Sequence, residues 1–347
     1  MTIRDIADEA GVSVATVSRL INNISVRSGN AEKIQAIIDK YNYHPNSIAQ
    51  SLKNKTTRTI GYLVSDISND YLISLAKVIE NTLGRNKYNI IVCSTDNHAE
   101  RELEYLNMLV SKKVDAIILN STGLNNEYVA GISHQVPVIL LHRRNTESSF
   151  RGDFIDCDNY HGSYLLTDHL LSLGHRKIAC ISGPVRLSNA AERYNGFNDA
   201  LKKYGVYQDD SENFVFTNFT YEDGFNAAAE LLSRKKRPTA IISMNNVMTL
   251  GVMKYFLESN IKAPDQCSIG SFGTIQRSEL YYIQPTYVTL DTDEMGKMAA
   301  EAVLSRIEDN KIMNRDFIYK PCLVIGNAEK CLHQRKGCGQ NRNNRQI

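Results

Sequence analysis

Short apolar runs alternate with amphipathic stretches along most of this chain, from Thr59 to Ile325. Apolar runs of this length are typical of buried strands, and the stretches between them have the spacing of helices with one apolar face. Continuous apolar strands separated by helices predict parallel sheets that are covered on both faces. About ten strands exceed one comfortable doubly wound sheet, so we expect an α/β body of two such sheets, of about five or six strands each, with a cleft between them.

The alternation also places the individual elements. The expected strands are Ile60–Val64, Ile90–Cys93, Ala116–Leu119, Val138–Leu141, Phe154–Cys157, Ile178–Ser182, Phe214–Phe216, Ala240–Ser243 and Ser268–Phe272, with a last strand near Phe317–Ile325. The expected helices are Tyr71–Asn86, Glu100–Ser111, His161–Leu173, Ala190–Tyr204, Gly224–Ser233, Met248–Ser259 and Glu294–Glu308.

The start of the chain reads as two short helices joined by a tight turn. Gly11 supplies a left-handed C-cap for the first helix, and Ser13 is a good N-cap for the second. Val17 leads the inward stripe of the second helix, which leaves short side chains pointing out. This pattern is typical of a helix-turn-helix, whose second helix enters the DNA major groove; the alternative is an ordinary helical hairpin. A third helix, from about Asn30 to Tyr41, would close a three-helix core.

Composition is that of an ordinary globular protein, with 42% hydrophobic and 22% charged residues. No apolar run reaches the roughly 18 residues of a membrane helix, so no membrane partner is expected. The N-terminus lacks a secretory apolar region, which favours the cytoplasm. The seven cysteines form no CxxC pair and are expected to be free thiols.

Charge is distributed unevenly along the chain. Residues 1–58 carry eight basic and five acidic side chains, and residues 330–347 carry five basic side chains and no acid. The net charge of the whole chain is only +2, so the segment between them is acidic. A basic head on an acidic body suits a module that binds a polyanion, attached to a domain with another task.

Domain boundaries follow from these changes of pattern. Pro45 ends the helical head, and the polar segment Lys53–Thr59 reads as a linker. We therefore expect a DNA-binding domain at 1–58, with a short segment at 46–52 before the linker. A body at 59–329 and a basic, disordered tail at 330–347 would follow.

The ordered motifs resemble those of the lac repressor (LacI/GalR) family of bacterial transcription regulators, from Thr2 to about Ala328. The head carries IRDIADEAGVSVATVSRLIN, and the body carries RTIGYLVSDISNDY, VPVILLHR, TDHLLSLGHRKIACISGP, ERYNGF and RPTAIISMNN. The resemblance implies a homodimer that binds double-stranded, pseudo-palindromic operator DNA. It also implies a body like a periplasmic binding protein, built from two doubly wound parallel-sheet subdomains. A small effector in the cleft would then switch the affinity for DNA, most often as part of repression.

The same similarity assigns DNA contacts. Val14 and Ala15 occupy the two main base-reading positions of the second helix, where they can contact thymine methyl groups but donate no side-chain hydrogen bond. Arg19 can form a fork onto guanine O6 and N7; its alternative role is to clamp a phosphate. The short polar residues suited to phosphates are Thr2, Ser13, Thr16, Ser18, Asn22 and Asn46.

The segment Asn46–Leu52 matches the hinge helix of the family. There, Leu52 would wedge between base pairs in the minor groove, with Ala49 and Gln50 beside it. The isolated segment is too short to be a stable helix, so we expect it to order only on DNA and in the dimer; the alternative is a plain linker. One departure concerns the third helix, which in the family usually begins with a Val-Ser-x-x-Thr cap that residues 26–30 lack.

Effector contacts are also implied by the resemblance. Arg193 aligns with the arginine that grips ligand oxygens, and Tyr71 and Phe219 match aromatic positions that stack on the ligand. Sugar-binding members usually carry acidic residues at three places where this chain has His142, Asn246 and Gly273.

The loss of three carboxylates from a cleft that keeps Arg193, with Arg143 nearby, favours an anionic effector such as a sugar phosphate or a sugar acid. The alternatives are an alignment shifted by one residue and a site that responds to no ligand.

Other functions find less support in the sequence. No nucleotide-binding, zinc-protease or hydrolase motif occurs, so neither catalysis nor a cofactor is expected. Cys331, His333 and Cys338 offer only three ligands in a loose tail, so no metal is expected. The remaining alternatives are a solute-binding protein, which the DNA-binding head disfavours, and an α/β enzyme with a fused regulatory head.

Overall fold

The computed structural model describes residues 1–21, 24–43, 56–206 and 213–332. The chain divides into two compact units, Met1–Arg58 and Thr59–Ile347. Some of the residues assigned to DNA contacts lie outside the described residues: Asn22, Asn46, Ala49, Gln50 and Leu52.

The first unit consists of three helices, α1 (Ile3–Ala10), α2 (Val14–Ile21) and α3 (Ser28–Tyr41). A capping box starts α1, in which the Thr2 hydroxyl accepts from the Asp5 N–H and the Asp5 carboxylate accepts from the Thr2 N–H. Gly11 ends the helix in the left-handed conformation, with φ 67°. The buried core of the unit is formed by Ile6, Ala7, Val17 and Ile34.

The third helix begins two residues before the expected start. Its N-cap position is Arg27, whose side chain makes no capping hydrogen bond. The third helix therefore lacks a side-chain cap at its N-terminus, as the sequence indicated. Its C-terminal end is conventional, because Asn42 adopts the left-handed conformation there with φ 45°.

The second unit contains two sheets of six strands each, as the strand count predicted. The first sheet has the order β11-β5-β4-β3-β1-β2, formed by β1 (Thr59–Val64), β2 (Asn89–Ser94), β3 (Ala116–Leu119), β4 (Val138–Leu141), β5 (Gly152–Cys157) and β11 (Asp316–Tyr319). The second has the order β12-β10-β9-β8-β6-β7, formed by β6 (Ile178–Ser182), β7 (Phe214–Phe216), β8 (Ala240–Ser243), β9 (Ser268–Phe272), β10 (Thr286–Thr289) and β12 (Cys322–Val324).

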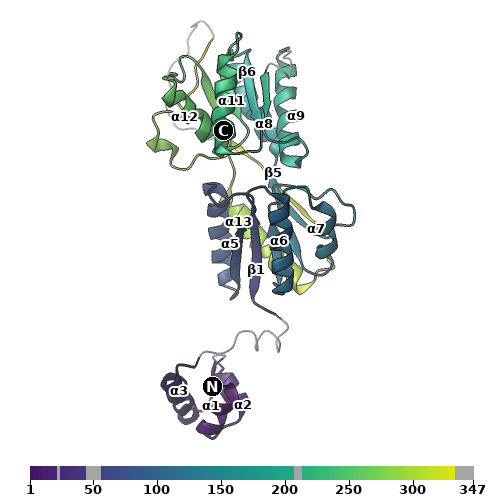
Figure 1. Ribbon diagram of the computed structural model, residues 1–347, viewed down its shortest axis with the longest axis vertical. Helices are drawn as coiled ribbons and strands as arrows, with labels where there is room; N and C mark the ends of the chain where they lie inside the picture. The colour runs from purple at the N-terminus through teal and green to yellow at the C-terminus, as the bar shows by residue number, and fades with distance from the viewer. Residues whose placement is uncertain (22–23, 44–55, 207–212, 333–347) are drawn as a thin grey trace. The chain divides into compact units, whose positions relative to one another are not determined.

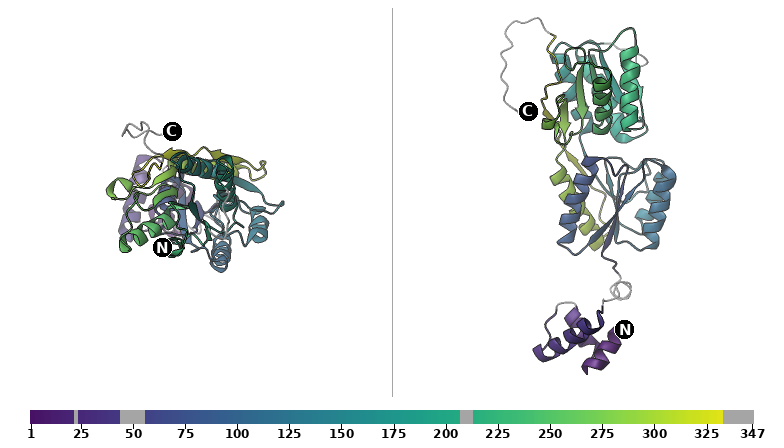
Figure 2. Two further views of the ribbon diagram at one scale, coloured as in Figure 1. Left: turned by 90° about the horizontal axis from the view of Figure 1, so that it is seen from above. Right: turned by 60° about the vertical axis from the view of Figure 1, so that its left-hand side comes forward.

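Helices cover both faces of each sheet (Figures 1 and 2). The first sheet carries α5 (Asp70–Gly84), α6 (Ala99–Ser111), α7 (Asn126–Ser133) and α13 (Thr292–Glu308), and together they form the first lobe. The second sheet carries α8 (Asn159–Ser172), α9 (Ser188–Lys203), α11 (Tyr221–Ser233) and α12 (Asn246–Glu258), and together they form the second lobe.

Strand β1 shows how the sequence produces this layering. Its side chains alternate between the two faces, so Tyr62 joins the cluster that contains Leu75 of α5 and Ala299 of α13. Leu63 instead joins the cluster that contains Leu109 of α6. A strand that is buried on both faces must be apolar at every position, which is the pattern that the sequence displays.

Two elements differ from the expectation. The stretch near Phe317–Ile325 was predicted as one strand, but it forms β11 in the first sheet and β12 in the second. Pro321 separates them, since it lacks the N–H that a continuous strand would need. Strand β12 also runs antiparallel to β10, so the second sheet is not wholly parallel. Strand β10 and helix α7 were not predicted.

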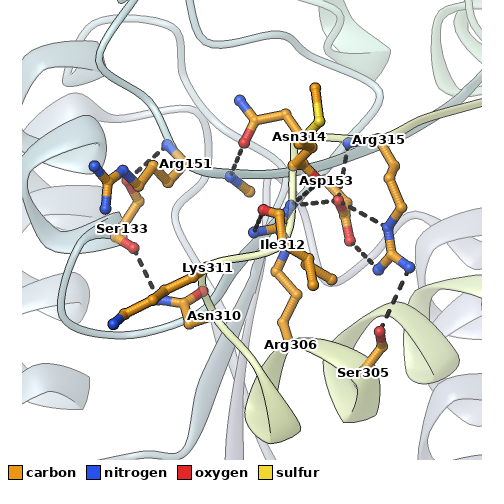
Figure 3. Close-up of polar contacts among 12 residues, drawn as sticks. Ser133, Arg151, Asp153, Ser305, Arg306, Asn310, Lys311, Ile312, Asn314 and Arg315 are labelled. Atoms are coloured by element: carbon orange, nitrogen blue, oxygen red, sulfur yellow. Dashed lines mark hydrogen bonds and ion pairs between the residues drawn. The ribbon is translucent and has the colours of Figure 1, made fainter.

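A buried ion cluster fixes the return of the chain from α13 to β11 (Figure 3). The carboxylate of Asp153, in β5, accepts from Arg306 at 2.6 Å and from Arg315 at 2.6 Å. Arg306 and Asp153 are fully buried. Arg306 also donates to the backbone oxygens of Ile312 and Met313, so the cluster holds the loop as well as the strand.

In the described part of the chain, no helix is long and apolar enough to cross a membrane. The cysteines of that part are free thiols; Cys93, Cys157, Cys180 and Cys267 are buried and Cys322 and Cys331 are exposed.

Candidate functional site

The outer face of α2 carries the residues that the sequence assigned to DNA bases. Val14, Ala15 and Arg19 are all exposed there. The hydroxyls of Ser13 and Thr16 lie 2.9 Å apart, and the Ser13 oxygen also accepts from the Thr16 N–H. These two side chains thus shape the start of α2 in addition to any phosphate contact.

The six residues that the sequence assigned to the effector line a single pocket. This pocket is lined by both lobes. Tyr71 and His142 come from the first lobe. The second lobe contributes Arg193, Phe219, Asn246 and Gly273.

Arg193 projects from α9 and is almost fully buried. Its Nε donates to Asn159 Oδ1 at 2.8 Å and its Nη1 donates to the Met244 carbonyl at 2.6 Å. The guanidinium plane lies over the ring of Phe272, with 3.8 Å between Cζ and the ring centroid. Burial lowers the pKa of Arg193, which means that the charged form is held at an electrostatic cost.

A second guanidinium, that of Arg143, enters the pocket from the end of β4. Its Nη1 donates to Asn97 Oδ1 at 3.0 Å and to the Ser121 carbonyl at 2.7 Å. Burial lowers its pKa to about 10, an effect that the neighbouring Arg193 increases and Glu102 opposes. The group is therefore still charged at neutral pH. Its Nε is buried and has no hydrogen-bond partner among the described residues.

His142 and Tyr71 form the wall of the pocket in the first lobe. His142 Nδ1 lies 3.0 Å from Asp156 Oδ1, and His142 Nε2 lies 3.4 Å from the Tyr71 hydroxyl. Burial, together with the nearby Cys157 and Asp156, raises the pKa of Tyr71, so its hydroxyl stays protonated. The pair offers aromatic surface and a polar edge to a ligand.

Three of the six pocket residues that the sequence assigned to the effector have positive φ angles. The values are 64° for His142, 70° for Phe219 and 100° for Gly273. Such a conformation is costly for a bulky residue like Phe219 and is found where the surrounding structure enforces it. The ring of Phe219 lies directly over Gly183, and a Cβ atom at residue 183 would overlap it. Gly183 is therefore needed for this placement of the ring.

Asparagines form much of the remaining wall, and the sequence analysis did not single them out. Asn69 and Asn245 are N-caps, which accept from the N–H groups of Tyr71 and Met248. Asparagine between a strand and the following helix is a signal that could have found them. Asn120 Oδ1 is buried without a partner among the described residues, so it is available to a ligand. The other lining residues missed are Ser65, Asp66, Leu72, Asn97, Asn189, Val247, Phe272 and Leu290.

A helix-turn-helix unit combined with a two-lobed body around a polar pocket defines a ligand-binding DNA regulator. Comparison with known families agrees with this class. The description "Bacterial regulatory proteins, lacI family" matches residues 2–46, and "Periplasmic binding proteins and sugar binding domain of LacI family" matches residues 57–324. The chain belongs to the LacI family of bacterial regulatory proteins.

Similar proteins of known function are repressors. The HTH-type transcriptional repressor PurR of Vibrio atlanticus is 33% identical over 336 residues, which cover 96% of this chain and 99% of that protein. PurR of Vibrio parahaemolyticus is also 33% identical, over 338 residues. These relatives are transcriptional repressors and not enzymes.

Solved structures show the same fold. The lac repressor dimer bound to operator and the anti-inducer ONPF has a TM-score of 0.81 and 23% identity, covering 95% of this chain and 99% of that one. A LacI family regulator from Enterococcus faecium with bound ribose has a TM-score of 0.70 and 27% identity, covering 79% of this chain and 100% of that one.

Proposed function

We propose that this chain is a cytoplasmic, homodimeric repressor that binds a pseudo-palindromic operator, and that a small anionic effector in the pocket controls its affinity for DNA. Family membership supports the repressor role, and the pocket supports the class of effector. Family membership does not say whether the effector strengthens or weakens DNA binding. Operator binding must therefore be measured with and without the effector.

The observation that carries the anionic effector is the presence of two buried guanidinium groups without a carboxylate partner. Among the described residues, Arg143 and Arg193 bond only to side-chain amides and backbone carbonyls. A buried charge without a direct ion-pair partner costs about 3–5 kcal/mol. Nearby carboxylates, Glu102 for Arg143 and Asp156 for Arg193, offset only part of the effect of burial. A phosphate or carboxylate bound between the two groups would offset that cost and accept hydrogen bonds from them.

A neutral sugar is the second candidate. The Enterococcus faecium relative binds ribose, and Asp66 places a carboxylate in the pocket that can accept from sugar hydroxyls. Asn120 and the other amides could serve either class of ligand, because an amide both donates and accepts.

On the DNA side, we infer that α2 reads bases through Val14, Ala15 and Arg19. Thr2, Ser13, Thr16 and Ser18 would contact phosphates, together with Asn22 and Asn46. Leu52 would wedge into the minor groove beside Ala49 and Gln50. Arg19 is exposed on α2, which leaves its guanidinium accessible to a base and supports its role as a reader.

An exposed apolar surface in the second lobe supports the homodimer. Leu257 of α12 and Tyr282 border the same hollow and expose 66% and 91% of their area. Leu280, in a short 3-10 turn (Ser278–Leu280), exposes 75%. Large exposed side chains gathered at one place mark an interface. A two-fold dimer then matches an operator with two half-sites.

The experiment is a thermal-shift screen of the purified protein against sugar phosphates, sugar acids, neutral sugars and nucleobases. A ligand that binds the folded state raises Tm by mass action. We expect the active compounds to be anions, with the shift abolished in R193A. Operator binding, measured with and without each active compound, then gives the direction of control. If only neutral sugars or nucleobases raised Tm, the proposal of an anionic effector would be wrong. The role as a ligand-controlled regulator would stand.

A further inference from the structure

A continuous run of hydrogen bonds joins the two lobes through residues that do not line the pocket. From the first lobe, Tyr71 approaches His142, and His142 Nδ1 lies 3.0 Å from Asp156 Oδ1. Asn159 Nδ2 donates to the second oxygen, Asp156 Oδ2, at 2.6 Å. Asn159 Oδ1 in turn accepts from Arg193 Nε at 2.8 Å. The run therefore begins and ends on pocket residues.

The central pair of this run, Asp156 and Asn159, lies where the chain crosses from the first lobe to the second. Asp156 belongs to β5 of the first sheet, and Asn159 is the first residue of α8 in the second lobe. Asp156 is 2% exposed and Asn159 is fully buried. Protein groups hold both side chains, since the Cys157 N–H also donates to Asp156 Oδ1 and Asn159 Nδ2 also donates to the Cys157 carbonyl at 3.2 Å.

The charge on Asp156 and the donor groups of Arg193 together set the direction of the bonds in the run. An ionised carboxylate only accepts, so His142 must present Nδ1–H to it, and in the neutral imidazole Nε2 is then an acceptor facing Tyr71. For the same reason Asn159 must turn its NH₂ group toward Asp156. Its oxygen is then the atom that faces Arg193, and it holds the Nε edge of that guanidinium.

We propose that Asp156 and Asn159 are a positioning pair that fixes the tautomer of His142 and the orientation of Arg193 across the crossing between lobes. This inference rests on the proposed function of the pocket and deepens it. Neither residue reaches the ligand. Asp156 acts on ligand affinity through His142, and Asn159 acts through Arg193. The pair thereby aligns the pocket residues of one lobe with those of the other.

The test exchanges the two side chains. In D156N an amide meets the Asn159 amide, and turning the latter over would place NH₂ against Arg193 Nε. In D156N/N159D the amide at 156 can donate to the carboxylate at 159, which accepts from Arg193, while the donation from residue 159 to the Cys157 carbonyl is lost. N159A removes the bond to Asp156 and the bond from Arg193 but keeps the contact between Asp156 and His142, and it serves if D156N does not fold.

The first readout needs no ligand. The imidazole ¹⁵N chemical shifts of His142, assigned by comparison with H142Q, report which ring nitrogen carries the proton. We expect the Nδ1–H form in the wild type, in N159A and in D156N/N159D, and a mixture of forms in D156N. A His142 spectrum that is the same in D156N as in the wild type would overturn the assignment of the tautomer to Asp156.

The second readout is the Kd of inorganic phosphate and of glucose 6-phosphate by calorimetry. Losing a hydrogen bond to a charged group predicts weakening by about tenfold or more in D156N and N159A. D156N/N159D should recover part of the affinity, because the contact with Arg193 is kept and the one with the Cys157 carbonyl is lost. If the double variant binds no better than D156N at equal thermal stability, the positioning role is wrong. If the wild type bound neither probe while its ¹⁵N shifts were as expected, the result would count against the anionic effector. The assignment of the His142 tautomer to Asp156 would stand.

Discussion

Phe219 joins an unfavourable backbone conformation to a ring that is almost completely buried, with 9% of its area exposed. The space for the ring exists only because residue 183 has no side chain. The pocket wall in the second lobe thus depends on a glycine that does not itself offer any group to a ligand.

The substitution G183A should displace the ring of Phe219 and weaken effector binding by about tenfold or more, because an overlapping Cβ forces the ring from its position. The free energy of unfolding should fall by only about 1–2 kcal/mol, since the ring can turn toward solvent. Calorimetric titration and urea unfolding measure the two effects. G131A is the matched control, because a Cβ at residue 131 in α7 meets no neighbour; unchanged affinity in G183A would contradict the role given to Gly183.

Arg19 tests the DNA-binding face at the same scale. R19A should weaken binding to an operator selected from random DNA by about 1–3 kcal/mol and relax the preference at one base pair. Fluorescence anisotropy on operator variants measures both. K33A, an exposed change on α3, is the control. A uniform loss across all sequences, with a smaller salt dependence, would show instead that Arg19 clamps a phosphate.

The individual pocket residues show where sequence reasoning succeeds and where it stops. Arg193 and Phe219 were assigned because they stand in motifs with a fixed place in the family, and the structure does bring them into one pocket. Asn120 and Asp156 carry no comparable local signal. Asp156 matters through its contact with His142, and Asn120 matters because its oxygen, which has no partner among the described residues, lines the pocket; no spacing in the sequence encodes either placement.

At the scale of the element, the edge of the first sheet is held by charge more than by apolar packing. Strand β11 pairs with β5 alone, and its residues are exposed or half-buried. The cluster of Asp153, Arg306 and Arg315 compensates by tying the loop before β11 to the middle of the lobe (Figure 3). Breaking it should therefore loosen β11 first.

The substitution D153N should cost about 3–5 kcal/mol at pH 7, because it leaves buried Arg306 without its counter-charge. Burial opposes ionisation of Asp153, but the two arginines outweigh it and lower its pKa below the usual range. The stabilisation is thus complete above about pH 4 and is lost as pH falls through the lowered pKa.

Urea unfolding at pH 7, 5 and 3 checks this prediction, and the difference between wild type and D153N should shrink only at the lowest pH. D316N is the control, because Asp316 forms an exposed ion pair with Arg144 that is worth little. A D153N penalty no larger than that of D316N would mean that the cluster does not stabilise the lobe.

Strands and helices were predicted correctly where the apolar character of their own residues shows that they are buried. Strands such as Ala116–Leu119 are apolar throughout, and their bounds were predicted correctly. Strand β10, Thr286–Thr289, is half-polar and follows Pro285, so its sequence resembles a loop until β9 and β12 pair with it. The division of Phe317–Ile325 between two sheets depends on the crossing between lobes, which no local pattern reveals.

At the scale of the whole molecule, the described chain leaves apolar side chains exposed that a second copy would cover. Three of them lie in the second lobe: Leu257 is in α12, Leu280 ends the short 3-10 turn, and Tyr282 follows that turn. Their exposure has no explanation within one chain, because ordinary burial would have favoured polar residues at these positions.

The substitution Y282D should convert the dimer into a monomer of 39.1 kDa, because a carboxylate would be desolvated at the centre of the interface. A monomer contacts a single half-site, so operator affinity should fall about a hundredfold or more. Sedimentation velocity and anisotropy measure the two consequences on one preparation. M313D is the matched control, since Met313 is 88% exposed in the first lobe, away from this surface, and its substitution should leave a dimer with full operator affinity. If Y282D remained dimeric, the interface would have to be sought on another face; if it became monomeric and kept its operator affinity, the two-fold recognition of DNA would be wrong.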